Sequence, residues 1–320
     1  MAFDLTGTGT EGDGLEAEEP TAPVAVLPRP DEEPPPSPPR RRRRRRPARA
    51  WEPIAAQVLL GLTAALVGFL VFVLLFSGLL QARAQAGLER RFARPLGYGK
   101  AVIGGDIRYG TPVARLDIPS LGVHEVVVEG TRADELRYGP GHLATSPLPG
   151  QLGNSVLAAH RLAWGGPFRG IGGLRPGQDI DVTTGQGHFT YRVNGHRTIS
   201  SSNTKPLGAT ADNRLTLVTA GDLTASQRLV VTSTLVGKAQ PTPAGRANLI
   251  SRADSGLTGQ GGISWELFLW LELLLVVVVA AVFVFRRFKG WSAYLLTAAP
   301  LAASLWVVYA NLGRLLPGTL

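Results

Sequence analysis

Residues 153–161 read Gly-Asn-Ser-Val-Leu-Ala-Ala-His-Arg, and residues 215–220 read Leu-Thr-Leu-Val-Thr-Ala. Each is a short apolar run with β-branched side chains, a pattern typical of a strand. Similar runs, broken by Gly, Pro and Asn, predict strands over Val113–Ile118, Val123–Val128, Ser155–Ala159, Asp179–Thr184, Phe189–Val193, Thr198–Ser201, Leu215–Thr219 and Arg228–Leu235. Several short strands with frequent turn signals favour an all-β domain over 105–238, either a barrel or a sandwich.

Three apolar segments flank this region. Val58–Leu80 contains no charged residue, and a helix needs only about 20 residues to cross a bilayer core of ~30 Å. A cleaved signal peptide is the alternative for this segment, but the segment is too long and its leader is unusual. We therefore expect three transmembrane α-helices with their connecting segments. The expected helices are 54–80, 263–285 and 291–313, with a connector over 81–104, a linker over 239–262 and a basic turn over 286–290.

Basic residues set the expected topology. Residues 1–53 are acidic, then proline-rich, then arginine-rich through Arg40–Arg46, and they predict a disordered cytoplasmic tail. The second basic block, 286–290, gives the same orientation, with the N-terminus inside and the domain outside the plasma membrane. The excess of Lys+Arg, 33 against 24 Asp+Glu, is concentrated near apolar segments. We therefore expect Arg40–Arg46 to contact membrane lipids rather than nucleic acid.

The sequence has no cysteine, which excludes disulfides, thiolate chemistry and cysteine metal sites. His124, His188 and His196 lack a second ligand at metal-binding spacing, so we expect surface histidines, no metal and no cofactor. Glu272 lies inside the second apolar segment, where a carboxylate is costly. It is either a functional contact or a side chain that reaches the outer interface near Trp265.

Several motifs of residues 97–238 occur in one order that resembles the sortase family, closest to the class E type of high-GC Gram-positive bacteria. The matching stretches are Leu116 to Val123, Val128 to Thr131, Gly139 to His142, Gly153 to Arg161, Gly166 to Phe168 and Leu215 to Thr219. The resemblance implies an eight-stranded β-barrel. It also implies a transpeptidase site in which a cysteine thiolate attacks a Thr–Gly bond of a sorting-signal peptide.

By position in these motifs, the resemblance assigns His160 as the proton donor and Arg228 as the residue that holds the substrate or the developing oxyanion. The cysteine should follow Thr219, but the residue there is Ala220, whose methyl group cannot attack. The interval from Ala220 to Arg228 is about one residue shorter than is usual for class E, so Arg214 is a second candidate for the arginine.

Other residues could contribute to the site. Thr219 is adjacent to position 220 but should face away from His160, because neighbouring strand side chains alternate. Ser226 would need a base to activate it. We interpret His142 as a structural residue of a turn, whereas Trp164 either lines a peptide groove or covers the barrel mouth.

Two classes of function follow. The first is a pseudoenzyme, a membrane-anchored sortase-like protein displayed outside the membrane. It would bind a sorting-signal-like peptide, a cell-surface or cell-wall protein or a membrane partner without cleaving it. The alternative is an active sortase, either because alanine at 220 replaces a natural cysteine or because another group attacks. The Gly221-Asp222 sequence favours the pseudoenzyme, since a single replacement would leave its neighbours typical of the family. A third interpretation makes the membrane part functional and the barrel an assembly domain, and the sequence predicts no oligomeric state.

Overall fold

The barrel contains two parallel neighbours, β4 (Asn154–Ala158) and β7 (Arg214–Ala220), which correspond to the two stretches quoted first. The computed structural model describes residues 52–243, 265–288, 290–316 and 319. Nearly all of the expected tail (1–53) and most of the expected linker (239–262) lie outside the described residues.

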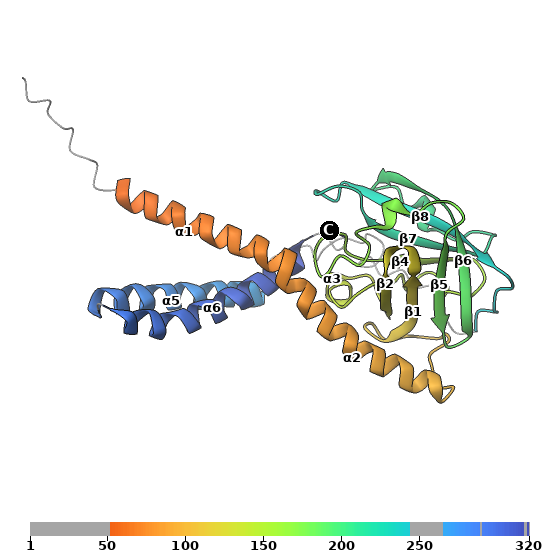
Figure 1. The fold of residues 1–320 in the computed structure, drawn as a ribbon, viewed down its shortest axis with the longest axis horizontal. Coiled ribbons are helices and arrows are strands. Elements are labelled where there is room, and N and C mark those ends of the chain that lie inside the picture. Colours follow the sequence, from red (N-terminus) through yellow and green to blue (C-terminus); the bar gives the residue numbers. More distant parts are fainter. Residues whose placement is uncertain (1–51, 244–264, 289, 317–318, 320) are drawn as a thin grey trace, which may run out of the picture. The chain divides into compact units, whose positions relative to one another are not determined.

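Eight strands close into a barrel in the order β1-β2-β3-β4-β7-β8-β6-β5 (Figure 1). The predicted eight-stranded barrel is therefore confirmed. The other strands are β1 (Pro112–Ile118), β2 (Val123–Glu129), β3 (Gly141–His142), β5 (Asp179–Thr184), β6 (Gly187–Ser200) and β8 (Gln227–Val236). The short helices between them are η2 (Pro119–Leu121), α3 (Ala133–Leu136), η3 (Ile171–Gly173) and η4 (Lys205–Leu207).

Two strand predictions differ from the structure. The separate strands expected at Phe189–Val193 and Thr198–Ser201 are one strand, β6, whose pairing with β8 shifts register between Val193 and Gly195. The bulge keeps the strand continuous through Asn194-Gly195, which the sequence pattern indicates as a break. Strand β3 was not predicted, because two residues are too few to show a periodic pattern.

Strand β4 is buried on both of its faces, which explains the apolar run Val156-Leu157-Ala158 at its end. Leu157 points into the main core inside the barrel. Val156 and Ala158 belong to a second cluster that also contains Leu136 and Leu143. Each fully buried leucine contributes about 1.5–3 kcal/mol relative to exposure. These two clusters hold the end of β4 in place for the residues that follow it.

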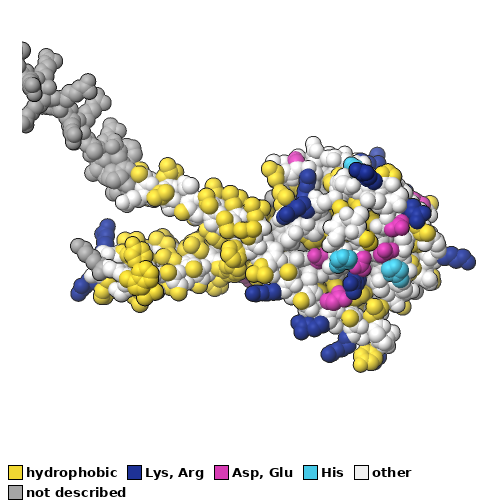
Figure 2. All heavy atoms as spheres, in the orientation of Figure 1, with side chains coloured by type: hydrophobic (Ala, Val, Ile, Leu, Met, Phe, Trp, Pro, Cys, Tyr) yellow, Lys and Arg dark blue, Asp and Glu magenta, His cyan; other side chains and the backbone are white. Residues whose placement is uncertain are grey.

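The chain contains three helical stretches, 55–97, 265–287 and 291–315, that are long and apolar enough to cross a membrane. Apolar side chains cover much of their surface in Figure 2. The first consists of α1 (Glu52–Val71), the π-helix η1 (Phe72–Phe76) and α2 (Ser77–Gly97); the others are α5 (Trp265–Arg287) and α6 (Trp291–Leu312) with η5 (Gly313–Leu315).

The segment expected as a connector, 81–104, is helical as far as Gly97 because one face of α2 packs on the barrel. Leu88 and Phe92 are buried against Val126 and Val128 of β2. The Gln85 side chain accepts from the Val126 backbone N–H at 2.7 Å and donates to the Val126 carbonyl at 3.0 Å. The helix therefore joins the strand ladder through one amide side chain.

Glu125 gives this contact a pH dependence. Burial raises the pKa of Glu125 to about 7, although the Gln81 amide donates to its carboxylate at 2.8 Å. The unfolded chain ionises Glu125 near the ordinary pKa of 4.5, whereas the folded chain does so only near 7. The stability from the neutral carboxyl group is therefore fully present below about pH 4.5 and is lost as the pH rises through about 7. We expect Glu125→Gln to raise the free energy of unfolding at about pH 8 by on the order of 1 kcal/mol, with little effect at about pH 5.

The matched control is Glu89→Gln, which removes a half-exposed carboxylate that pairs with Arg115 at 3.0 Å in the same contact. Thermal unfolding in detergent at both pH values measures the difference. An equal effect of Glu125→Gln at both pH values would contradict the titration of this carboxyl group.

Candidate functional site

The parallel pairing of β4 and β7 brings His160 and Ala220 to the same end of the barrel. The last pair of the ladder is Ala158 with Val218, and His160 and Ala220 each lie two residues beyond it. On the other side of β7, Ala220 pairs directly with Arg228 of β8, and directly opposed residues project to one face. His160, Ala220 and Arg228 are 2%, 0% and 4% exposed.

The two strands separate just beyond this last pair. The Ala159 N–H still donates to the Val218 carbonyl at 3.2 Å, but the next donors, Arg161 N–H and Ala220 N–H, both donate to the carbonyl of Thr319 at 3.1 and 3.2 Å. Thr319 is 2% exposed. A residue from the other end of the described chain therefore lies between the ends of β4 and β7.

His160 is neutral in this environment. Among the described residues, neither of its ring nitrogens has a hydrogen-bond partner. Burial disfavours the charged imidazolium and lowers the pKa of His160 to about 3. The ring could still accept or donate a proton, but no ionisable group stands at position 220.

The hydroxyl groups closest to position 220 are already used in hydrogen bonds. The Thr219 hydroxyl donates to the Ala159 carbonyl at 2.8 Å. The Ser226 hydroxyl donates to the Asp222 carboxylate. This bond, followed by one from Thr224, holds the pKa of Asp222 below its usual range. Thr219 therefore bonds a backbone carbonyl and no base, while the carboxylate beside Ser226 is a weak base because its pKa is lowered.

Two arginines differ sharply in position. Arg228 is buried opposite Ala220, and burial lowers the pKa of its guanidinium. Arg214 begins β7, about 20 Å along the strand from Ala220, and its Nε donates to Asp212 at 2.9 Å. The structure therefore brings Arg228, not Arg214, beside Ala220, at the end of the barrel that His160 also reaches.

A profile of the sortase domain matches residues 116–236, which contain these strands and the site. The chain contains a sortase domain. Among curated proteins, Sortase D of Bacillus subtilis (strain 168) is 37% identical over 78 residues, which are 24% of this chain and 38% of the relative. Sortase SrtE1 of Streptomyces coelicolor is 33% identical over 96 residues, 28% of this chain and 27% of the relative. The chain thus spans well under half the length of these relatives.

Solved sortase structures are also similar to the sortase domain. A Clostridium perfringens Sortase D5 transpeptidase is 28% identical with a TM-score of 0.44, covering 48% of this chain and 99% of that chain. Sortase E from Streptomyces avermitilis is 32% identical with a TM-score of 0.39, covering 41% of this chain and 91% of that chain.

Arg161 belongs to the sortase-domain site, although the sequence did not single it out. Its Nη1 donates to the carbonyls of Ala220 and Gly221 at 3.2 and 2.7 Å. The side chain thus fixes the end of β7, while its backbone N–H bonds Thr319. Its place directly after His160 was the available signal, but the sequence showed no partner for it.

Trp164 packs against the first helical stretch instead of lining an open groove. It is 5% exposed, and its backbone N–H donates to the Ser77 hydroxyl at 2.9 Å. Its ring meets Phe72 edge-on, with centroids 6.4 Å apart. Trp164 has φ of 50°, a left-handed conformation that is uncommon outside glycine. The loop after His160 is therefore held by the helix at the π-helical segment.

His142 is a buried link between elements of the sortase domain. Its Nδ1 lies 2.8 Å from the Glu129 carboxylate and its Nε2 lies 2.9 Å from the Pro147 carbonyl. Both side chains are almost completely buried. His142 and Glu129 also pair in the β3–β2 ladder. His142 therefore links strands of the barrel, as the sequence predicted for a structural residue.

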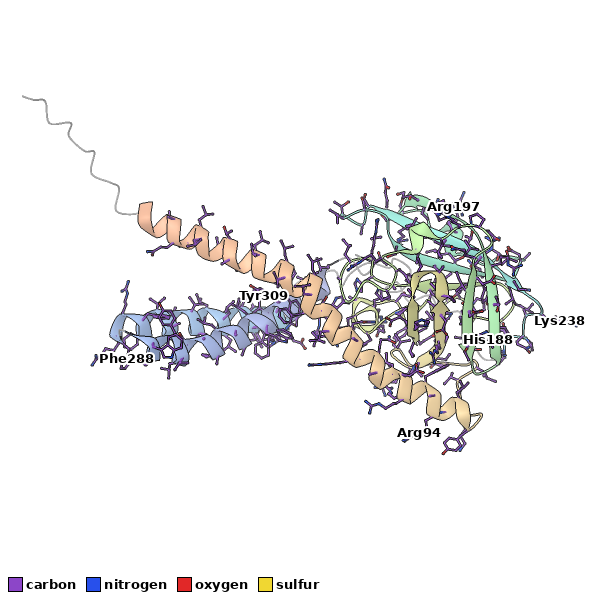
Figure 3. All side chains as sticks on the ribbon, viewed as in Figure 1. Arg94, His188, Arg197, Lys238, Phe288 and Tyr309 are labelled. Carbon is purple, nitrogen blue, oxygen red and sulfur yellow. The ribbon has the colours of Figure 1, made fainter. Side chains whose placement is uncertain are left out.

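The remaining candidates do not meet at the site. His124 lies 2.8 Å from Asp117, and the exposed His188 lies 3.1 Å from the Thr183 hydroxyl (Figure 3). Among the described residues, no group of three or more His, Cys, Asp or Glu side chains is placed to hold a metal ion. Glu272 is exposed on α5, outside the barrel.

The buried imidazole predicts a pH-dependent stability. The unfolded chain protonates His160 near its ordinary pKa of 6.5, whereas the folded chain does so only near 3. The stability from a neutral buried histidine is therefore present above about pH 6.5 and is lost as the pH falls toward 3. The free energy of unfolding of the unmodified chain should therefore decrease between about pH 7.5 and about pH 5. We expect this decrease to be smaller in His160→Leu, by up to ~2 kcal/mol.

Denaturant unfolding of the full chain in detergent measures this loss at both pH values. His124→Leu, which removes an exposed histidine, is the matched control and should leave the pH dependence close to that of the unmodified chain. An unchanged pH dependence in His160→Leu would show that the imidazole also titrates in the folded state.

Proposed function

We propose that the sortase domain is a non-catalytic peptide-binding domain at the outer face of the plasma membrane, where it binds or assembles cell-surface proteins. The observation that carries this proposal is the fully buried methyl group of Ala220, at the position where the sortase resemblance implies a cysteine nucleophile. Covalent catalysis requires a group that can ionise or be deprotonated there, and a methyl group does neither.

The neighbouring groups support a site without a substitute nucleophile. Thr219 donates to a backbone carbonyl and Ser226 donates to Asp222. His160 has a pKa of about 3 and is neutral, so it supplies no charge that would stabilise an attacking anion. The polar groups that remain suit the binding of peptide carbonyls rather than their attack.

The alternative function is an active sortase, in which residue 220 is cysteine in the natural protein or another group attacks. The register that sets His160 and Arg228 around position 220 favours this alternative. A turnover assay of the chain with Ala220 tests the form of this alternative in which another group attacks.

We expect the purified full-length chain to release no product from Leu-Pro-any-Thr-Gly or Leu-Ala-any-Thr-Gly peptides and to form no covalent acyl intermediate, because position 220 lacks a thiol. Mass spectrometry of the peptide detects cleavage, and mass spectrometry of the intact protein detects an acyl intermediate. An active sortase assayed in parallel is the positive control. Turnover that disappears in His160→Ala would overturn the proposal.

The helices support the proposed location. Three helical stretches have the length and composition of membrane spans, and Arg286 and Arg287 end α5. With the N-terminus in the cytoplasm, Arg40–Arg46 would meet anionic lipids on the inner face. An odd number of spans then places the end of α6 on the same side as the sortase domain.

Single introduced thiols test this topology, because the chain contains no cysteine. We expect Ser202→Cys, on an exposed turn of the barrel, to react with a membrane-impermeant maleimide on intact cells. Arg287→Cys, at the exposed end of α5, should react only after the cells are permeabilised. Labelling of Arg287→Cys on intact cells would reverse the proposed orientation of the hairpin.

A further inference from the structure

The carbonyl oxygen of Thr319 lies between the ends of β4 and β7. The space between these strand ends, next to Ala159, Arg161 and Ala220, is called the cleft below. It accepts hydrogen bonds from Ala220 N–H and Arg161 N–H, and the Thr219 hydroxyl is 3.3 Å from it. These donors come from two different strand ends, so the carbonyl bridges the point where the ladder opens. Peptides that add to a sheet are recognised through backbone hydrogen bonds of this kind.

A series of contacts leads α6 toward this cleft. The Tyr309 hydroxyl donates to the Ala65 carbonyl at 2.7 Å. The Tyr309 ring, labelled in Figure 3, packs on Phe69 and Phe72. The ring centroids are 5.6 and 6.0 Å apart. Phe72 also meets Trp164, which follows His160 closely in the chain. The last turns of α6 are therefore fixed to the same helix that holds the Trp164 loop.

The residues after α6 are fixed in turn by Arg314. Its guanidinium lies 3.6 Å from Asp134 of α3 and 3.3 Å from Glu266 at the start of α5. From Leu315, the end of η5, the four residue steps to Thr319 can span at most ~14 Å. The contacts of Arg314 therefore keep the buried Thr319 close to the end of η5.

The sequence of this segment has the chemistry of a sorting peptide. Residues 316–320 read Leu-Pro-Gly-Thr-Leu, so residues 316–319 repeat the Leu-Pro-any-Thr pattern of the assay peptides named above. The Thr carbonyl is the group that a nucleophile at position 220 would attack in such a peptide. In this chain, it is the group that the Ala220 N–H bonds.

We propose that residues 316–320 are the peptide ligand of this cleft, bound within the same chain, with the Thr319 carbonyl fixed beside residue 220. The inference rests on the proposed function, because a catalytic site would cleave the Thr319–Leu320 bond and release Leu320. A ligand joined by a short linker has an effective concentration in the millimolar range. A peptide of a partner protein with the same Leu-Pro-any-Thr chemistry therefore has to displace it.

The test uses the thiol of Ala220→Cys, which is unique because the chain contains no cysteine. The variant is made in the full-length chain and in a chain that ends at Leu316, both in detergent. A maleimide probe measures the rate of thiol modification. We expect the shortened chain to react at least about tenfold faster, because the thiol no longer needs the segment to leave before it is exposed.

Two further variants keep the chain length. Thr319→Arg introduces a long charged side chain at a buried position and should speed modification as truncation does. Thr319→Ser keeps the backbone carbonyl and a small hydroxyl side chain, so it should not. Ser202→Cys in place of Ala220→Cys, on an exposed turn, reports the intrinsic reactivity in each background. Circular dichroism checks that each variant retains the barrel.

Added peptide completes the test. Acetyl-Leu-Pro-Gly-Thr-Leu-amide should slow modification in the shortened chain, while a peptide of the same composition in scrambled order should not. The intact mass of unlabelled Ala220→Cys is measured as well. A thioester between the new thiol and the Thr319 carbonyl, formed with release of the following residue as an amine, would block the thiol and would equally support the bound segment.

Equal modification rates in the full-length and shortened chains would overturn the inference, whether both are fast or both are slow. That result would not touch the proposed function, which fails only if the unmodified chain turns over peptide. Conversely, turnover in the unmodified chain would reject the proposed function even if truncation exposes the thiol.

Discussion

The parallel register of β4 and β7 is the constraint on which the rest of the structure depends. It is set by burial on both faces of β4, where Leu157 faces the barrel core and Val156 faces a second apolar cluster. A shift of one residue would exchange these two faces. Because the residues that follow each strand inherit the register, the same packing places His160 level with Ala220.

The sequence predicted the strands that bury long apolar runs, because these patterns are local. The local patterns left a barrel or a sandwich open, and the barrel was predicted from the order of the family-like motifs. It missed β3, which is too short to show a period, and it divided β6 at a bulge that tertiary pairing with β8 keeps continuous. The candidate site was accessible only through motif position. The contact of Thr319 with the strand ends joins residues about a hundred positions apart, and no local pattern indicates such a contact.

Under the proposed function, the cleft binds a peptide backbone without attacking it. Its hydrogen-bond donors are backbone N–H groups and the Thr219 hydroxyl, which favour the carbonyl of an extended peptide. The imidazole of His160 is neutral and the methyl of Ala220 is inert. In such a site, hydrogen bonds to the peptide backbone provide the affinity. The side chains of the peptide provide the specificity.

Closure of the barrel affects how copies of the protein can associate. The strand order returns from β5 to β1, so the sheet has no edge strand that another chain could extend. Edge strands are where β-domains begin to aggregate or exchange segments between molecules. Together with a sequence that contains no cysteine to form covalent cross-links, this closure limits association between copies of the chain through their barrel strands.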